Sequence, residues 1–162
     1  VLDAKAKVGT NVHEAIGDLV SGNFPLLETE KAVGYFRSYE RWHSSEKPQY
    51  LRMEQRFYDD KLMITGQVDA IVNVGSEQHV LIDFKTSYTP NPDIWVLQAH
   101  FYWHLCHVNS VELSKKMKWI NLDRKGGNPR IFNFDFSEVT MLRCIDLATQ
   151  WWIDYENSKD ET

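Results

Sequence analysis

Three charged residues stand where a buried strand normally carries none. Asp69 lies in the segment GQVDAIV, and Asp83 and Lys85 lie in LIDFKTS, and both segments are otherwise mainly apolar. A buried charge costs free energy unless it is paired or binds an ion. These residue types favour a divalent cation held by carboxylates, with a lysine beside it that stabilises developing negative charge.

Strand alternation puts Asp83 and Lys85 on one face of their segment. If the connecting loop covers residues 74–78, Asp69 lies opposite Asp83, with Cβ atoms roughly 4.5–5.5 Å apart. A slip of one residue would turn Asp69 to the other face. Two carboxylates at that distance repel each other, and one pKa rises unless a cation lies between them. The alternative is a buried pair of Lys85 with one of the aspartates that serves only packing.

Four further polar residues are candidates for the same site. His13 lies beside the apolar stripe of a first helix, in GTNVHEAI, and Glu54 lies in the strand that precedes Asp69. Gln98 and Tyr102 are four residues apart, so they share one face of a later helix. Each has a structural alternative: a surface histidine, a cross-strand partner for a neighbouring arginine, and polar packing at a helix edge.

The elements that must position these residues can be read from hydrophobic periodicity. Segments with strand-like alternation are 50–58, 62–73, 79–87, 116–123 and 130–136, and segments with helical spacing are 11–21, 28–43, 93–107 and a final helix after Ser137. The order α, α, β, β, β, α, β, β, α predicts an α/β (α+β) protein with a mixed central sheet and helices packed on it. We expect one domain over residues 1–162.

Three local details follow from the same patterns. Thr10 or Asn11 is expected to cap the first helix, because both side chains accept hydrogen bonds from the first amides of a helix. Strict alternation in YLRMEQRFY puts Leu51 on the core face of its strand. Ile94 is expected on the core face of the third helix.

Composition excludes several classes of protein. The chain of 162 residues is 43% hydrophobic and 13% aromatic, which argues against disorder and suits one compact core. No apolar run is long enough to span a membrane, so no membrane partner is expected. Two cysteines suit a reducing compartment and cannot form a four-thiolate zinc or iron–sulfur site. No G-x-x-x-x-G-K-[ST] loop occurs, so no nucleotide cofactor is expected.

A local basic surface is encoded late in the chain, although the net charge of −5 argues against wholesale wrapping of nucleic acid. The segment KKMKWINLDRKGGNPR carries six basic residues, namely Lys115, Lys116, Lys118, Arg124, Lys125 and Arg130. These side chains can bind the phosphates of a nucleic acid. The alternative is a solvated hairpin whose charged edges discourage aggregation.

Taken together, the segments GTNVHEAI, GQVDAIV, LIDFKTS and QAHFY resemble the PD-(D/E)XK nuclease superfamily. The resemblance covers residues 9–135 and is to the RecB-type exonuclease branch, with its phage exonucleases and the mitochondrial genome maintenance exonuclease. It implies a restriction-endonuclease-like αβββαβ core flanked by helices. It also implies a cytoplasmic protein of a bacterial host or a virus, with the nucleus and the mitochondrion as alternatives.

The resemblance implies a role for each residue by its position. His13, Asp69 and Asp83 correspond to metal ligands, and the carbonyl of Phe84 to a further one. Lys85 corresponds to the catalytic lysine. The implied cofactor is one or two Mg²⁺ or Mn²⁺ ions, with no iron–sulfur cluster.

Other positions correspond to parts that hold the substrate. Gln98 and Tyr102 match a Q-x-x-x-Y motif that helps to place the DNA strand, and Glu54 matches an additional acidic position of some members. The basic residues named for nucleic-acid binding are Lys115, Lys116, Arg124 and Lys125.

The implied function is metal-dependent hydrolysis of phosphodiester bonds by a DNA exonuclease of phage or recombination-repair type, acting on single strands or duplex ends. Two alternatives stay open. One is an RNA-cutting endonuclease of the cap-snatching kind, and the other is an inactive nuclease-like module that binds nucleic acid or a protein. The Q-x-x-x-Y helix favours the first function, and Lys85 argues against the binding module, since binding alone does not need it.

Overall fold

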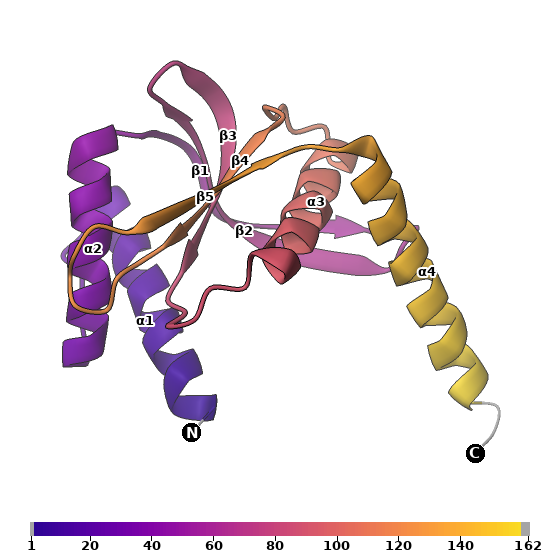
Figure 1. The fold of residues 1–162 in the computed structure, drawn as a ribbon, viewed down its shortest axis with the longest axis horizontal. Helices are drawn as coiled ribbons and strands as arrows, with labels where there is room; N and C mark the ends of the chain where they lie inside the picture. The colour runs from indigo at the N-terminus through magenta and orange to yellow at the C-terminus, as the bar shows by residue number, and fades with distance from the viewer. Residues whose placement is uncertain (1, 160–162) are drawn as a thin grey trace.

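A five-stranded mixed sheet separates two pairs of helices (Figure 1). The computed structural model describes residues 2–159, with side chains described for residues 6–157. The elements are α1 Leu2–Val20, α2 Glu30–Glu46, β1 Gln49–Asp59, β2 Ile64–Val74, β3 Glu77–Lys85, α3 Pro92–Val108, β4 Lys116–Asn121, β5 Arg130–Asp135 and α4 Glu138–Lys159. This order is the predicted one. Residue 1 and residues 160–162 of the expected domain lie outside the described part.

The strands lie side by side in the order β1-β2-β3-β4-β5. All neighbours are antiparallel except β3 and β4, which are parallel and joined by α3. The predicted fold class, a mixed sheet flanked by helices, is therefore confirmed. Between residues 2 and 159, none of the helices has the length and apolar character that crossing a bilayer requires.

Two apolar cores fill the space on the two sides of the sheet. On the side of α1 and α2, Tyr39 packs with Ile82 and Phe84 of β3. On the side of α3, Leu81 packs with Trp119 of β4. Successive residues of β3 thus enter opposite cores, as strand alternation requires. β3 is the strand that carries Asp83 and Lys85, so this packing surrounds the candidate site with apolar residues.

The β2–β3 hairpin has the register that was predicted to place Asp69 opposite Asp83, but the predicted loop over residues 74–78 was wrong. The strands extend to Val74 and Glu77, and a register shift between Val72 and Val74 gives the predicted pairing beyond it. The ladder includes the pair Ala70–Ile82, and the next step would bring the two aspartates opposite each other. At that step the backbone N–H of Phe84 donates a hydrogen bond to the carboxylate of Asp69 at 2.7 Å, in place of a hydrogen bond between the two strands. The regular pairing of β2 with β3 therefore stops at the level of the aspartates.

The first helix begins earlier than its apolar stripe predicted. Thr10 and Asn11 lie inside α1, so the prediction that either caps the helix was wrong. The segment before them is rich in Ala and Lys, which are strong helix formers and extend the helix. Asn11 instead fastens the connection to α2: its Nδ2 donates to the carbonyl of Leu26 at 2.9 Å, and its Oδ1 accepts the amide of Glu28 at 3.0 Å.

Strict alternation in β1 was also wrong. The register shifts between Tyr50 and Arg52, and Glu54 has a φ of +48°, in the left-handed region. Leu51 is consequently 41% exposed instead of facing the core. These irregularities bend the strand beside the candidate site and change which side chains point inward.

The core face of α3 differs from the predicted one. Ile94 is 57% exposed, whereas Trp95 is buried. This helix is apolar on most of its circumference, so spacing alone does not select the face that packs on the sheet. Gly66 of β2 contributes to the choice, because a Cβ there would lie 2.8 Å from the ring of Tyr102. The missing side chain lets α3 bring Tyr102 close to the sheet.

Candidate metal centre

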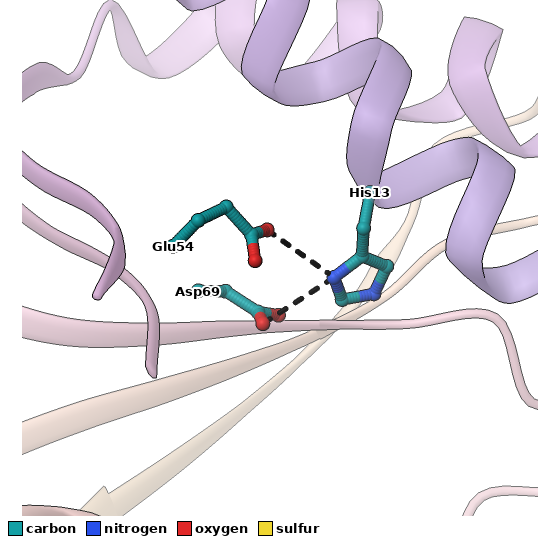
Figure 2. Close-up of side chains that lie close together, drawn as sticks. All are labelled: His13, Glu54 and Asp69. Carbon is teal, nitrogen blue, oxygen red and sulfur yellow. Dashed lines mark ion pairs between the residues drawn. The ribbon is translucent and has the colours of Figure 1, made fainter. Parts of the chain in front are cut away.

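Three side chains with potential metal ligands converge from different elements (Figure 2). His13 comes from α1, Glu54 from β1 and Asp69 from β2, and their ligand atoms all lie within 4.8 Å of one another. The Nδ1 of His13 lies 3.3 Å from Oδ1 of Asp69 and 3.7 Å from Oε1 of Glu54. Both carboxylates point at the same ring nitrogen (Figure 2). One imidazole and two carboxylates suit a divalent cation such as Mn²⁺.

Glu54 reaches this point because its backbone is left-handed, with φ +48°. Such a conformation costs a non-glycine residue roughly 1–3 kcal/mol and persists only where the surroundings impose it. The neighbouring arginines have other partners: Arg52 donates to Gln55 and Arg56 donates to Gln67. The alternative in which Glu54 pairs with a neighbouring arginine is therefore not the arrangement in the structure.

Gln67 is a part of this site that sequence reasoning missed. Its Nε2 donates to Oε2 of Glu54, and its Oε1 accepts from Arg56 at 3.2 Å. Gln67 thus holds the carboxylate of Glu54 on the side that faces His13. The available signal was spacing, because Gln67 precedes Asp69 by two residues on the same strand.

His13 is held at both ring nitrogens. Its Nε2 donates to the carbonyl of Phe84 at 2.9 Å, while Nδ1 faces Asp69 and Glu54. Burial alone would lower the pKa of His13, but the hydrogen bond and charge of Asp69, and then the bond to Glu54, raise it to about 11. The protonated ring therefore places a positive charge between two carboxylates, where a bound cation would place its own.

The contact with Phe84 also orients the ring for ligation. A metal-binding histidine usually donates its second N–H to a carbonyl or carboxylate, which fixes the tautomer. In this site the carbonyl of Phe84 accepts from Nε2 of His13, so Nδ1 is the nitrogen available to an ion. The expectation that the Phe84 carbonyl is itself a ligand stays a prediction.

Asp83 and Lys85 form a buried ion pair next to this cluster. Nζ of Lys85 lies 2.7 Å from Oδ2 of Asp83, and Asp83 is only 2% exposed. Burial, and then the charge of Asp69, raise the pKa of Asp83, and the opposing effect of Lys85 does not cancel them. Within the described residues this Oδ2 has no hydrogen bond beyond the ion pair. The site holds three carboxylates, from Glu54, Asp69 and Asp83, against the two cationic side chains of His13 and Lys85, and this excess of negative charge fits a divalent cation.

This imbalance predicts an unusual stability effect for Asp83→Asn in the presence of a chelator. The pKa of Asp83 is higher in the folded state than in the unfolded state, so ionisation of this carboxyl lowers the free energy of unfolding. The loss is absent below the unfolded-state pKa and complete above the folded-state pKa. We therefore expect the variant to melt a few degrees higher than the parent near about pH 8, since about 1 kcal/mol moves Tm by about 2–4 °C at this chain length. The advantage should shrink as the pH falls and nearly vanish by about pH 3, where Asp83 is mostly protonated in the unfolded state as well as in the folded one.

Thermal unfolding of parent and variant over this pH range, followed by circular dichroism, would test the effect. A clearly lower Tm for Asp83→Asn near about pH 8 would mean that the pair with Lys85 stabilises the fold by more than burial and repulsion cost. In that case the structural alternative for the two residues would be correct.

The third helix reaches the same point from the opposite side of the sheet. Nε2 of Gln98 donates to the hydroxyl of Tyr102 at 2.9 Å, and Oε1 of Gln98 accepts from Trp119 at 3.4 Å. Burial, and then the charge of Asp83, raise the pKa of Tyr102 to about 12. Gln98 and Tyr102, which were predicted to share a helix face, are therefore hydrogen-bonded to each other. The hydroxyl of Tyr102 lies close enough to Asp83 for its charge to affect the pKa.

The basic residues of the late hairpin separate into two groups. Lys115 directly precedes β4 and Lys116 is its first residue, and Lys116 pairs with Asp135 at 2.5 Å. Arg124 and Lys125 lie in the β4–β5 loop, beyond the end of β4 that adjoins Lys85. β4 is six residues long, which puts the two groups about 20 Å apart along the strand. Nucleic-acid binding stays a prediction for all four, and the position relative to Lys85 favours Arg124 and Lys125.

Comparison with known proteins adds an independent result. The model of a family described as the PD-(D/E)XK nuclease superfamily matches residues 23–141. The matched region contains all five strands and α3, and hence Glu54, Asp69, Asp83 and Lys85, but it begins after His13. No curated protein matches the sequence.

Proposed function

The chain belongs to the PD-(D/E)XK nuclease superfamily, and from this premise we propose that it is a divalent-metal-dependent exonuclease that hydrolyses DNA. One observation carries the proposal: His13, Glu54 and Asp69 converge beside the buried Asp83–Lys85 pair. The cluster can bind a cation, and the lysine can stabilise negative charge that grows during phosphodiester hydrolysis.

In this proposal His13, Asp69 and Asp83 hold one or two Mg²⁺ or Mn²⁺ ions, with Glu54 as a further ligand. When bound, such a cation supplies positive charge at the scissile phosphate and lowers the pKa of the attacking water. Asp83 fixes Nζ of Lys85 at 2.7 Å, so the ammonium is positioned before substrate arrives. Its charge is then available to the phosphoryl oxygens in the transition state.

The substrate strand is proposed to lie between α3 and the β4–β5 loop. The hydroxyl of Tyr102 and the amide of Gln98 provide polar groups on the α3 side. Arg124 and Lys125 provide positive charge on the loop side. A strand held at both sides would place one phosphate at the centre.

Incubation of labelled nucleic acids with Mg²⁺, Mn²⁺ or EDTA tests the proposal. Linear and circular DNA, single-stranded and duplex, are compared with linear RNA. We expect digestion of linear DNA from its ends with either metal, intact circles, and no reaction in EDTA. Cleavage of circles or of RNA would favour the endonuclease alternative. Intact substrates with every metal would favour a binding module.

The protonated state of His13 leads to a prediction for metal binding. Because the pKa of His13 is about 11, a cation that binds Nδ1 must displace a proton. We expect Mn²⁺ affinity to increase with pH by up to about tenfold per unit around neutrality. His13→Ala should weaken Mn²⁺ binding by at least about tenfold and DNA binding by less. Binding of one Mn²⁺ ion to this variant should release about one proton fewer than binding to the parent.

Calorimetry in two buffers of different ionisation enthalpy measures both the affinity and the proton count. His107→Ala is a matched control, since His107 is exposed on α3 and stacks on Trp103 away from the cluster. Unchanged Mn²⁺ affinity in His13→Ala would remove His13 from the site.

We further expect activity with both metals, and more with Mn²⁺ at equal low concentration, because an imidazole ligand disfavours Mg²⁺.

A further inference from the structure

A cavity of about 410 Å³ opens at the carboxyl ends of the parallel strands β3 and β4. Its lining includes Ser87, Tyr88, Asn121, Arg124 and Arg130. Ser87 follows Lys85 by two residues, so their Cα atoms lie within about 7 Å. Ligands of open α/β sheets commonly bind at this end of parallel strands. The cavity therefore adjoins the candidate metal centre without sharing its cluster of ligands.

One wall of the cavity is the β4–β5 loop, which is fixed against α2. Nε of Arg41 donates to the carbonyl of Gly126 at 2.7 Å. Gly34 of α2 lets the loop approach, because a Cβ there would lie 1.8 Å from the carbonyl oxygen of Arg124. The carboxylate of Asp123 accepts hydrogen bonds from two backbone N–H groups of the loop itself, those of Lys125 and Gly127. The loop thus presents Arg124 from a defined position.

The cavity combines an exposed aromatic ring with oriented cations. The guanidinium of Arg124 lies over the ring of Tyr88, 4.9 Å from its centroid, and Tyr88 is 76% exposed. With its amide oriented to satisfy both neighbours, Asn121 donates to the carbonyl of Ser87 at 3.0 Å and accepts from Arg130 at 3.3 Å. An aromatic face suits a base, and guanidinium groups suit a phosphate.

We propose that this cavity is a subsite for one unpaired nucleotide of the substrate, next to the scissile phosphate. The base stacks with Tyr88, and the phosphate faces Arg124 and Arg130. The inference rests on the proposed nuclease function and narrows its substrate to a strand with unpaired bases. Inside a duplex the base faces stay stacked on their neighbours and are not available to Tyr88. The volume lies within the range of small-ligand pockets, about 300–1,000 Å³.

Equilibrium binding in EDTA tests the subsite without cleavage. Fluorescence anisotropy compares a labelled single strand, a blunt duplex and a base-free deoxyribose phosphate strand of the same length. Tyr88→Ala should weaken binding of the single strand by about tenfold, as expected for one lost stacking contact. Binding of the duplex and of the base-free strand should not change. Tyr88→Trp should retain the affinity of the parent.

Tyr58→Ala is the matched control, because Tyr58 is also exposed, at 57%, but lies on β1 outside the cavity. It should leave all three affinities unchanged. Equal losses on the base-free strand, equal losses in Tyr58→Ala, or no loss in Tyr88→Ala would each overturn the proposal. Cleavage assays keep the two proposals distinct. If the parent protein cleaves no substrate, the proposed nuclease function is wrong, while the binding comparison still tests whether the cavity binds an unpaired nucleotide.

Discussion

Asp83→Asn should lose at least about three orders of magnitude in cleavage rate while remaining folded. The substitution keeps the shape of the side chain and removes the charge that we assign to metal binding. It also releases Lys85, whose Nζ lies 2.7 Å from Oδ2 of Asp83. A loss of several kcal/mol in transition-state stabilisation corresponds to such a factor, because each ~1.4 kcal/mol changes the rate about tenfold. Single-turnover kinetics over a range of metal concentrations would separate weaker metal binding from slower chemistry.

Asp135→Asn is the control for this experiment. Asp135 makes an ion pair with Lys116 at 2.5 Å. Asp135→Asn therefore makes the same chemical change as Asp83→Asn and likewise removes the ionic partner of a lysine. It lies on β5 and is exposed, away from the cluster. The control should cleave as the parent does. If Asp83→Asn did the same, Asp83 would be a structural partner of Lys85 and not a ligand.

Lys85→Ala should slow cleavage by roughly two to three orders of magnitude, as for the loss of one electrostatic stabiliser. On our proposal its ammonium acts on charge that develops only in the transition state, and such interactions change turnover far more than ground-state affinity. Metal affinity should hold or increase, because a neighbouring positive charge is removed. DNA affinity should fall only modestly, as for one lost phosphate contact among several. Single-turnover kinetics and filter binding on the same variant measure these quantities.

Lys118→Ala provides a closely matched control. The side chain of Lys118 is 21% exposed and pairs with Glu77, and that of Lys85 is 19% exposed and pairs with Asp83. The two lysines lie on the neighbouring strands β4 and β3. Lys85→Arg retains the positive charge and should lose less activity than Lys85→Ala. Cleavage by Lys85→Ala at the parent rate would restrict Lys85 to a structural role.

Much of the arrangement was accessible from local sequence patterns. Periods of two and of three to four residues predicted the order of the elements, because both patterns arise from which side chains face a core. The charges of Asp69, Asp83 and Lys85 stood out because apolar strands rarely carry them. The facing register of the two aspartates was predicted correctly, but from the wrong loop, because a register shift between Val72 and Val74 and not a loop over residues 74–78 produces it. Their catalytic and ligand roles remain predictions for the variants above.

Other features depended on contacts that no local pattern encodes. The left-handed backbone of Glu54 turns its carboxylate towards His13, although strand alternation predicts only which residues share a face. Gln67 orients that carboxylate across two strands. The face of α3 that meets the sheet was chosen by packing, since this helix is apolar on most sides and Gly66 admits Tyr102.

By itself the sequence determined the fold class, the order of helices and strands, and the kinds of group at the centre, because these depend on residue type and short-range spacing. Tertiary structure decided how the groups meet. His13 donates to the carbonyl of Phe84, and Arg41 donates to that of Gly126, across separations of 71 and 85 residues. Such contacts form only when the helices pack on the sheet, since burial and strand pairing bring distant segments together and local propensity does not.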